Sequence, residues 1–221
     1  MTEPTTPIAG MSRRAFALGC TGAAALLALG GLSALPAEAQ VRPPGGQDED
    51  HLLSACIRCE RCIEVCPKNA LRPAHPEEGI FGVRTPMANF NVGWCDFCVE
   101  HNDGVPLCEK TCPTNALRLR AGATPETTIL GKAHIIKDWC LAYRNAGCRF
   151  CYDACIDAGY DAIDLDVDKR PVVNVEKCVG CGACQSVCVS LKEGSIREGA
   201  TSRAIIVVTE ERLAELEGGG R

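Results

Sequence analysis

Aromatic side chains are scarce in this chain, where phenylalanine, tyrosine and tryptophan make up only 5% of 221 residues. That share is thin for a conventional hydrophobic core, so we expect another component to fill and cross-link the interior. Catalytic fingerprints are also lacking, because the sequence contains no G-x-S-x-G, Walker or dinucleotide-binding motif. After Leu35 there is no apolar run of membrane-spanning length, so we expect the mature chain to be soluble or peripheral to a membrane.

Cysteine is abundant instead, and sixteen of the seventeen cysteines form four groups of four. Motif 1 is Cys56, Cys59, Cys62 and Cys66; motif 2 is Cys95, Cys98, Cys108 and Cys112; motif 3 is Cys140, Cys148, Cys151 and Cys155; motif 4 is Cys178, Cys181, Cys184 and Cys188. Motifs 1 and 4 have the C-x2-C-x2-C-x3-C spacing of bacterial ferredoxins, and motifs 2 and 3 lengthen one gap. The sequence therefore predicts four 4Fe–4S clusters with these sixteen cysteines as iron ligands.

Other uses of cysteine fit this pattern less well. Structural zinc sites use widely separated cysteine pairs or Cys/His mixtures, whereas here three thiolates of one motif crowd together. Cysteines three apart in tight loops seldom reach disulfide geometry. A covalent haem needs C-x-x-C-H, which is lacking, and a Rieske centre needs two histidine ligands. The histidines show no such ligand pattern; they are His51, His75, His101 and His134.

Residues 1–39 resemble a twin-arginine signal peptide. Arg13 and Arg14 precede an apolar stretch that runs to about Leu35, and a small-x-small cleavage site ends at Ala39. This route carries folded proteins, which suits clusters that are inserted while the thiols are still reduced. An ordinary secretory signal and a retained membrane anchor are the alternatives. Cys20 lies inside this segment, so we expect it to be removed with the signal.

Residues 40–52 are predicted to be a flexible leader, because a Pro-Pro-Gly-Gly stretch at 43–46 is followed by Gln47 and the acidic residues 48–50. The formal net charge of the chain is −5, and thiolate-bound clusters would add more negative charge. This balance argues against a nucleic-acid partner and favours a basic docking partner.

The chain is internally repetitive, since the sequence CPKNAL at 66–71 is answered by CPTNAL at 112–117. We predict an α+β fold of duplicated bacterial-ferredoxin-like modules built around four 4Fe–4S clusters, in a four-cluster domain at 53–200. Residues 201–221 are expected to form a terminal strand and a charged, frayed tail, with a short docking helix at 210–217 as the alternative. Strands are expected at 133–137, 163–167, 172–175 and 205–208, and short helices beginning at Pro67 and Pro113.

The signal, the four motifs and their flanking residues resemble the periplasmic ferredoxin-type proteins of the NapG/MauM family. The resemblance extends to Thr85-Pro86, to residues 94–98 (WCDFC), to 137–141 (KDWCL) and to 176–184 (EKCVGCGAC). Motifs 3 and 4 depart from the ferredoxin signature, because no proline follows their last cysteine. The resemblance implies export, four clusters, a membrane-bound quinol dehydrogenase as electron donor and a periplasmic terminal reductase or cytochrome as acceptor.

Two ways of pairing the motifs remain open. In two-cluster ferredoxins the fourth cysteine of each motif ligates the other cluster, so two motifs lock together. The similarity of neighbouring motifs favours sequential pairing, 1 with 2 and 3 with 4. The outermost position of the compact motifs favours nested pairing, 1 with 4 and 2 with 3. We favour nested pairing slightly, because four-cluster subunits of molybdenum oxidoreductases are arranged that way.

The combined interpretation is an electron-transfer protein without its own substrate site, in which single electrons pass from cluster to cluster. The alternatives are an iron–sulfur subunit of a molybdenum- or hydrogenase-type enzyme and a redox maturation factor. Trp94 and Trp139, which precede the first cysteines of motifs 2 and 3, are interpreted as shields against water, with a role in the electron path as the alternative. Gly180 and Gly182 are interpreted either as loop-forming residues or as backbone donors to cluster sulfur.

Overall fold

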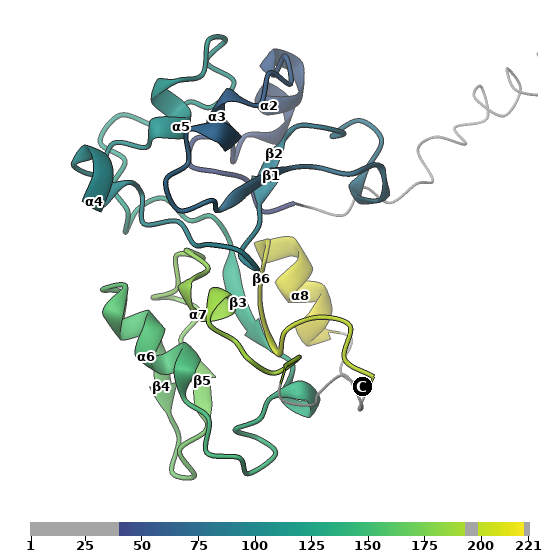
Figure 1. Ribbon diagram of the computed structural model, residues 1–221, viewed down its shortest axis with the longest axis vertical. Coiled ribbons are helices and arrows are strands. Elements are labelled where there is room, and N and C mark those ends of the chain that lie inside the picture. Colours follow the sequence, from purple (N-terminus) through teal and green to yellow (C-terminus); the bar gives the residue numbers. More distant parts are fainter. Residues whose placement is uncertain (1–39, 193–198, 219–221) are drawn as a thin grey trace, which may run out of the picture. The chain divides into compact units, whose positions relative to one another are not determined.

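The computed structural model describes residues 40–192 and 199–218, which belong to one compact unit, Glu38–Arg221 (Figure 1). The predicted signal peptide, with Arg13, Arg14 and Cys20, lies outside the described residues. Among the described helices, none has both the length and the apolar character that a membrane crossing requires.

The first half of this unit consists of short helices around one hairpin. Its elements are α2 (Glu49–Ala55), α3 (Arg61–Glu64), β1 (Leu71–Pro73), the 3-10 helix η1 (Pro76–Glu78), β2 (Pro86–Ala88), α4 (Val99–Asn102) and α5 (Leu107–Lys110). Strands β1 and β2 pair antiparallel, with Arg72 opposite Met87. The backbone N–H of Arg118 donates to the carbonyl oxygen of Gly45 at 2.9 Å, so the two ends of this half meet.

The second half contains two antiparallel pairs of strands, one of which is a hairpin. Its elements are β3 (Lys132–Ile135), the 3-10 helix η2 (Lys137–Trp139), α6 (Phe150–Asp157), β4 (Ile163–Leu165), β5 (Pro171–Val173), α7 (Ala183–Ser186), β6 (Ile205–Val208) and α8 (Glu210–Gly218). Strand β4 pairs antiparallel with β5, and β3 pairs antiparallel with β6, which joins the two ends of this half.

The two halves repeat one order of parts. Each has a cysteine motif, then a two-stranded hairpin, then a second cysteine motif, and each is closed by contact between its ends. The helices and strands are mixed, as the predicted α+β class requires. The hairpin matters for the function, because it turns the chain back and places the second motif of a half beside the first.

Cysteine side chains form a large part of the interior. The main buried cluster combines Phe90, Ile163 and Ile205 with several cysteines, which are Cys151, Cys155, Cys178 and Cys184. A second cluster packs Leu52 and Leu117 against Cys108. The low aromatic content is therefore matched by a core in which cysteine replaces large apolar side chains.

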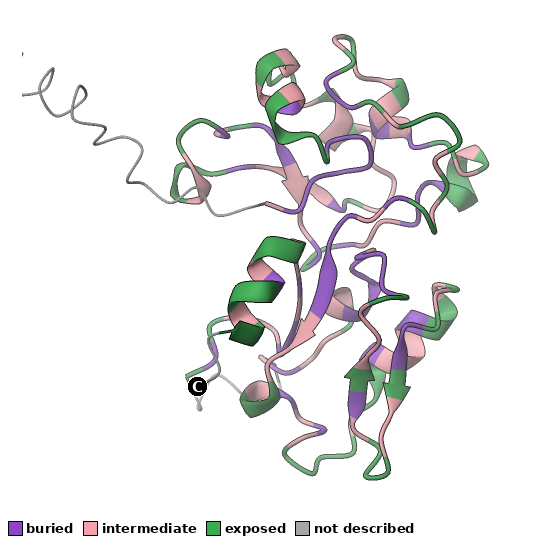
Figure 2. Cartoon of the chain, turned by 180° about the vertical axis from the view of Figure 1, so that it is seen from behind, coloured by how far each residue is buried: buried purple, intermediate pink, exposed green. Residues whose placement is uncertain are grey.

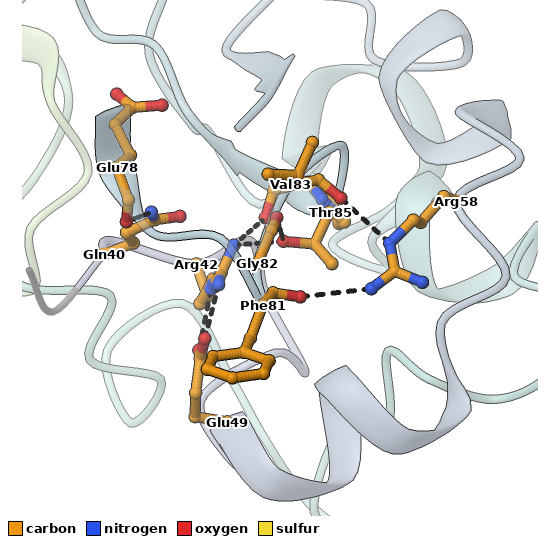
Figure 3. A network of polar contacts seen from close by, with 10 residues as sticks. Gln40, Arg42, Glu49, Arg58, Glu78, Phe81, Gly82, Val83 and Thr85 are labelled. Atoms are coloured by element: carbon orange, nitrogen blue, oxygen red, sulfur yellow. Dashed lines mark hydrogen bonds and ion pairs between the residues drawn. The ribbon is translucent and has the colours of Figure 1, made fainter. Parts of the chain in front are cut away.

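The predicted flexible leader at 40–52 is wrong. Val41 is 8% exposed and Arg42 is 4% exposed, and Pro43 and Pro44 are fully buried. The Arg42 guanidinium donates to Thr85 Oγ1 at 2.9 Å and to the Pro86 carbonyl at 3.0 Å, and it pairs with Glu49 (Figure 3). A proline-rich extended segment can pack as tightly as a strand, and its composition does not reveal that.

The acidic residues after this segment begin α2. The Asp48 side chain accepts a hydrogen bond from the backbone N–H of His51 at 3.0 Å and so caps the helix. Glu49 and Asp50 lie in its first turn, where the helix dipole favours negative charge. The acidic run is therefore a helix start and part of the folded unit.

The predicted helices beginning at Pro67 and Pro113 are also wrong. The helices of motifs 1 and 2 are α3 and α5, which end before these prolines. Each proline instead enters a turn that contains an asparagine with positive φ, Asn69 at 51° and Asn115 at 52°. Asparagine tolerates the left-handed conformation better than most residues, so the repeated C-P-x-N sequence encodes a turn.

The strand predictions are confirmed at β3, β4, β5 and β6; the bounds of β6 are as predicted, and those of the other three differ by at most two residues. The predicted frayed tail is wrong, because residues 210–218 form α8. Leu213 of α8 is 6% exposed, and this helix contacts β3. Its other described residues are half-buried or exposed, as Figure 2 shows. The charged residues of the tail are the solvent face of an amphipathic helix.

One glycine position tests how closely the motif 4 loop fits against the residue before β3. Gly180 has a φ of +75°, and a Cβ atom there would lie 2.4 Å from the backbone N and O of Gly131. Gly159 has a φ of +86° but no atom within 4 Å of such a Cβ, so it isolates the cost of the left-handed conformation.

We expect Gly159→Ala to lower the free energy of unfolding by about 1–2 kcal/mol. Gly180→Ala should lower it by about 2 kcal/mol more, because backbone at Gly131 must move. Anaerobic denaturant titration followed by circular dichroism measures both changes. Equal destabilisation by the two substitutions would contradict the close approach at Gly131.

Candidate metal centres

The structure brings the sixteen cysteines together as four quartets, each lining its own cavity. Site I consists of Cys56, Cys59, Cys62 and Cys112; site II of Cys66, Cys95, Cys98 and Cys108; site III of Cys155, Cys178, Cys181 and Cys184; site IV of Cys140, Cys148, Cys151 and Cys188. Each site thus takes three cysteines from one motif and the fourth cysteine from its partner motif.

This arrangement decides how the motifs pair. Motif 1 shares sites I and II with motif 2, and motif 3 shares sites III and IV with motif 4. The expected exchange of the fourth cysteine is present, but the nested pairing that we favoured is wrong. The β1–β2 and β4–β5 hairpins return the chain onto the preceding motif, so sequential neighbours meet.

The cysteine loops of motifs 1 and 4 share an unusual backbone conformation. Arg58 and Glu60 lie between the cysteines of motif 1 with φ of 57° and 63°, and Gly180 and Gly182 occupy the same places in motif 4 with φ of 75° and 82°. The left-handed conformation turns the chain tightly enough for consecutive cysteines to face one cavity.

Glycine is needed in motif 4 for a further reason, because a Cβ at Gly182 would lie 2.2 Å from the Phe90 ring. The loop-forming interpretation of these glycines therefore has direct support. Motif 1 adopts the same turn with Arg58 and Glu60, which carry charged side chains.

Backbone N–H groups donate to cysteine sulfur at several sites. Ala162 donates to Cys155 Sγ at 3.2 Å, and Ala133 donates to Cys178 Sγ at 3.4 Å. In the first half, the N–H groups of residues 58, 70 and 107 donate at 3.4 Å to their cysteines, which are Cys56, Cys66 and Cys98 respectively. Such bonds favour the thiolate and raise the reduction potential of a cluster that the thiolates bind.

Four thiolates in one quartet would repel one another unless a positively charged group lies between them. Burial, followed by the charges of neighbouring cysteines, raises the pKa of Cys62 and of Cys151 to about 12. Burial likewise raises the pKa of Cys184 well above its ordinary value, with Cys181 and Cys178 adding to the effect. Four thiolates can share such a cavity only if a cationic core offsets their repulsion, and a 4Fe–4S core meets this need.

Cys112 behaves differently from the other thiols. Burial alone would raise its pKa, but backbone N–H groups of Leu117, Thr114 and Ala116 and the Thr114 hydroxyl together lower it. These donors come from the turn after Pro113. The turn that replaces the predicted helix therefore supplies the hydrogen bonds that favour a thiolate at this position.

Sites II and III are in direct contact. The backbone N–H of Cys95 donates to the carbonyl oxygen of Cys181 at 2.8 Å. Phe90 lines the cavity of site II and packs on Gly182 of the site III loop. Burial, with the charges of Cys181 and Cys95, raises the pKa of Tyr160, which lies between both sites. Together with the exchanged cysteines, these contacts arrange the sites in the order I, II, III, IV.

Asp96 is a residue of site II that sequence reasoning missed. It lies between two cysteines of motif 2, is 7% exposed, and accepts a hydrogen bond from the Cys98 N–H at 2.9 Å. Its Oδ2 atom is 3.9 Å from Lys68 Nζ and 3.6 Å from His101 Nδ1. The signal in the sequence was an aspartate inside a C-x-x-C loop, where a short side chain can cap the turn.

Asp96, Glu100 and His101 offer three ligand atoms within 4.8 Å of one another. Lys68 already supplies a cation there, because its ammonium group is 2.6 Å from Glu100. We therefore assign these residues to a local ion-pair network at the surface of site II.

The two tryptophans lie where the shielding interpretation expects them. Trp94 lines the cavity of site II, and Lys68 Nζ is 5.1 Å from the centre of its ring. Trp139 packs against the small cluster of Cys140, Ala142 and Ala204 beside site IV. Both side chains are half-buried, so each covers a site with apolar surface while it reaches solvent.

Comparison with known proteins agrees with this arrangement. A 4Fe–4S dicluster domain profile matches residues 55–117, which hold motifs 1 and 2, and a 4Fe–4S binding domain profile matches residues 169–190, which hold motif 4. The methylamine utilization ferredoxin-type protein MauM of Methylorubrum extorquens is 36% identical over 214 residues, covering 89% of this chain and 91% of the relative. No solved structure matches the chain.

A second MauM, from Paracoccus denitrificans, is 33% identical over 185 residues, covering 80% of this chain and 79% of the relative. The ferredoxin-type protein NapG of Escherichia coli is 30% identical over 162 residues, covering 68% and 66% respectively. The chain belongs to the NapG/MauM family of ferredoxin-type proteins. As a NapG/MauM-type protein it binds 4Fe–4S clusters and takes part in electron transfer.

The buried charge of Asp96 provides a test at site II. We expect Asp96→Asn to raise the reduction potential of site II by tens of millivolts, because a nearby negative charge disfavours the added electron. The amide keeps an oxygen that can accept the Cys98 N–H. Redox titration followed by electron paramagnetic resonance measures the shift.

Glu100→Gln is the matched control. The Glu100 side chain is 64% exposed, so solvent screens its charge and we expect little change in potential. If Asp96→Asn leaves the reduction potential of the site II cluster unchanged, the Asp96 carboxylate does not influence that cluster.

Proposed function

We propose that this protein is a periplasmic electron-transfer protein that relays single electrons through four 4Fe–4S clusters bound at sites I to IV. The sixteen cysteines of the four motifs are the proposed iron ligands. The observation that carries the proposal is the series of four cysteine quartets, each linked to the next by an exchanged cysteine or a backbone hydrogen bond. A protein of this kind has no need of a substrate site of its own.

The chain's own residues set the conditions for such a relay. When bound, each cluster accepts and donates one electron. Backbone donors such as Ala133 and Ala162 hold the thiolates in place, and Phe90, Trp94 and Tyr160 exclude water from the two inner sites. Exclusion of water and fixed hydrogen bonds limit the reorganisation that accompanies each change of charge.

The resemblance to the NapG/MauM family supports a proposal for the partners. We propose that electrons enter from a membrane-bound quinol-oxidising protein and leave to a periplasmic reductase such as nitrate reductase. The MauM relatives, whose name refers to methylamine utilization, support an electron-transfer chain of methylamine oxidation as the second candidate. In both cases the chain acts as a carrier between redox partners.

Ligand exchange within a pair of motifs makes a sharp prediction about iron content. Cys56 and Cys112 lie in the same site, so replacing both with alanine should remove one cluster and leave about twelve irons in the anaerobically purified protein. Cys56 and Cys66 belong to one motif but to different sites, so replacing both should damage two clusters. Iron and sulfide analysis with electron paramagnetic resonance measures the difference.

The intact protein is the reference and should hold about sixteen irons. If the variant with both motif 1 cysteines replaced keeps more iron than the variant with Cys56 and Cys112 replaced, motifs do not exchange ligands. Zinc in place of iron in the intact protein would end the proposal of a cluster relay.

Export by the twin-arginine route is a separate part of the proposal. We expect substitution of Arg13 and Arg14 by lysine to hold the precursor in the cytoplasm, because the route reads the arginine pair as well as its charge. Fractionation of cells that produce the tagged full chain measures the result. Unchanged export of this variant would favour an ordinary secretory signal.

A further inference from the structure

Site I is the most exposed of the four cysteine sites. Cys59 is exposed, and the other three cysteines of site I are half-buried. Each of the other sites contains at least two buried cysteines. Site I also lies at one end of the order I to IV. A redox partner would therefore come nearest to the bound group at this end of the chain of sites.

Large apolar side chains are exposed on the cysteine loop of motif 1 and on the loop that Arg58 binds. Ile57, in the cysteine loop, is 61% exposed and lines the site I cavity. Ile80 and Phe81, in the loop before β2, are 55% and 64% exposed. We name these three residues and Cys59, with the neighbouring Arg58, Arg61 and Arg84, the docking patch. Clustered exposed apolar residues commonly mark interaction sites.

Two arginine side chains hold the loop of Phe81 against the cysteine loop of motif 1. The Arg58 guanidinium donates to the carbonyl oxygens of Phe81 at 3.1 Å and of Val83 at 2.9 Å (Figure 3). The Arg84 guanidinium donates to the Glu60 carboxylate at 2.6 Å. Because Arg58 and Glu60 are the left-handed residues between the cysteines, the turn that forms site I also positions the docking patch.

The charge of the docking patch is opposite to that of the whole chain. The site I cavity is lined by Arg58, Arg61 and Arg84 but by one acidic residue, Glu60. The net charge of the chain is −5. Within the part of the chain that the structure describes, the lining of sites III and IV contains no charged side chain. Site II is lined by Arg42 and Lys68 and by one acidic residue, Asp96. The larger excess of basic over acidic lining residues is therefore at site I, the most exposed site.

We propose that the docking patch is an electron-exchange port for a redox protein whose own docking face has an apolar centre and an acidic rim. This inference rests on the proposed electron-transfer function and adds the place and the chemistry of one partner. One electron passes from the partner to this protein or back, so one is oxidised as the other is reduced, and no bond forms or breaks. Complementary charge steers the encounter, and the apolar centre supplies contact.

Net charge alone predicts a basic docking partner. The arginines at site I instead favour an acidic partner at this end of the protein. Redox complexes use small interfaces and short lifetimes, so a few exposed side chains suffice. The arginines remain charged while they donate hydrogen bonds, since the guanidinium does not lose its proton under ordinary conditions. Arg61 is exposed on α3 and adds to this positive rim.

The experiment uses the full chain loaded with its clusters and two probe proteins, a flavodoxin with carboxylates around its flavin and a cytochrome c with lysines around its haem. Stopped-flow mixing measures the second-order rate of reduction by flavodoxin hydroquinone at low salt. We expect Arg61→Glu to lower this rate about tenfold and Phe81→Ser to lower it several-fold. Added salt should shrink the effect of Arg61→Glu.

The turn between β4 and β5 offers matched controls. Val167 is 98% exposed and Lys169 is exposed, so Val167→Ser and Lys169→Glu make the same kinds of change away from site I. We expect both control variants to react with flavodoxin at the rate of the unaltered protein. Equal rates for patch and control variants would overturn the proposal. The rate of electron transfer to cytochrome c is measured in the same way, and an Arg61→Glu variant that slows this reaction but not the reaction with flavodoxin would also overturn the proposal.

Two further measurements separate the possible failures. Iron and sulfide analysis of each variant measures its cluster content. If a patch variant keeps all its clusters and reacts at the unaltered rate, the docking patch is wrong but the proposed electron-transfer function is unaffected. An unaltered protein that binds iron poorly counts against the proposed function. Sedimentation of the unaltered protein tests self-association, and a dimer that Phe81→Ser disrupts would assign the docking patch to a second copy of this chain and overturn the proposal.

Discussion

The exchange of the fourth cysteine between neighbouring motifs is the constraint on which the structure depends. Cys112 completes site I and Cys66 completes site II, so neither motif 1 nor motif 2 can form a site alone. The same holds for Cys155 and Cys188 in the second half. The smallest unit that can bind a cluster is therefore a pair of motifs together with the hairpin that joins them.

This constraint also explains why so little regular structure is needed. The described strands have three or four residues each, and many helices are single turns. Short elements of this kind do not hold together alone, because isolated hairpins and single helical turns are marginal in water. Sites that tie distant segments together supply the missing stability, as metal sites do in other small folds. The contact of Cys95 with Cys181 then joins the two halves at their inner sites.

The gathering of the cysteines into groups of four is easier to predict from the sequence than the pairing of the motifs. Spacing identifies the cysteines because a cluster needs three thiolates on one tight loop, and that need is local. Pairing depends on how the chain returns between motifs, and the three-residue strands β1 and β2 leave only a weak pattern. The segment at 40–46 was misjudged for the opposite reason. Its prolines and glycines are typical of linkers, while its burial comes from Thr85, Pro86 and Leu117, which lie far along the sequence.

Crowded thiols link cluster loading to folding, and this link supports the proposed export of the folded chain. Four thiolates in one site repel one another, and burial raises the pKa of thiols such as Cys62 and Cys151. Without a bound group the cysteines of a site therefore favour the protonated form. A bound cluster favours the thiolate form of its cysteines, so cluster binding stabilises the folded chain. A protein of this design must receive its clusters where thiols are reduced, because sixteen free cysteines in an oxidising compartment would form disulfides. The paired arginines at 13 and 14 fit that requirement, since a route for folded proteins is the one by which a loaded chain can leave the cytoplasm.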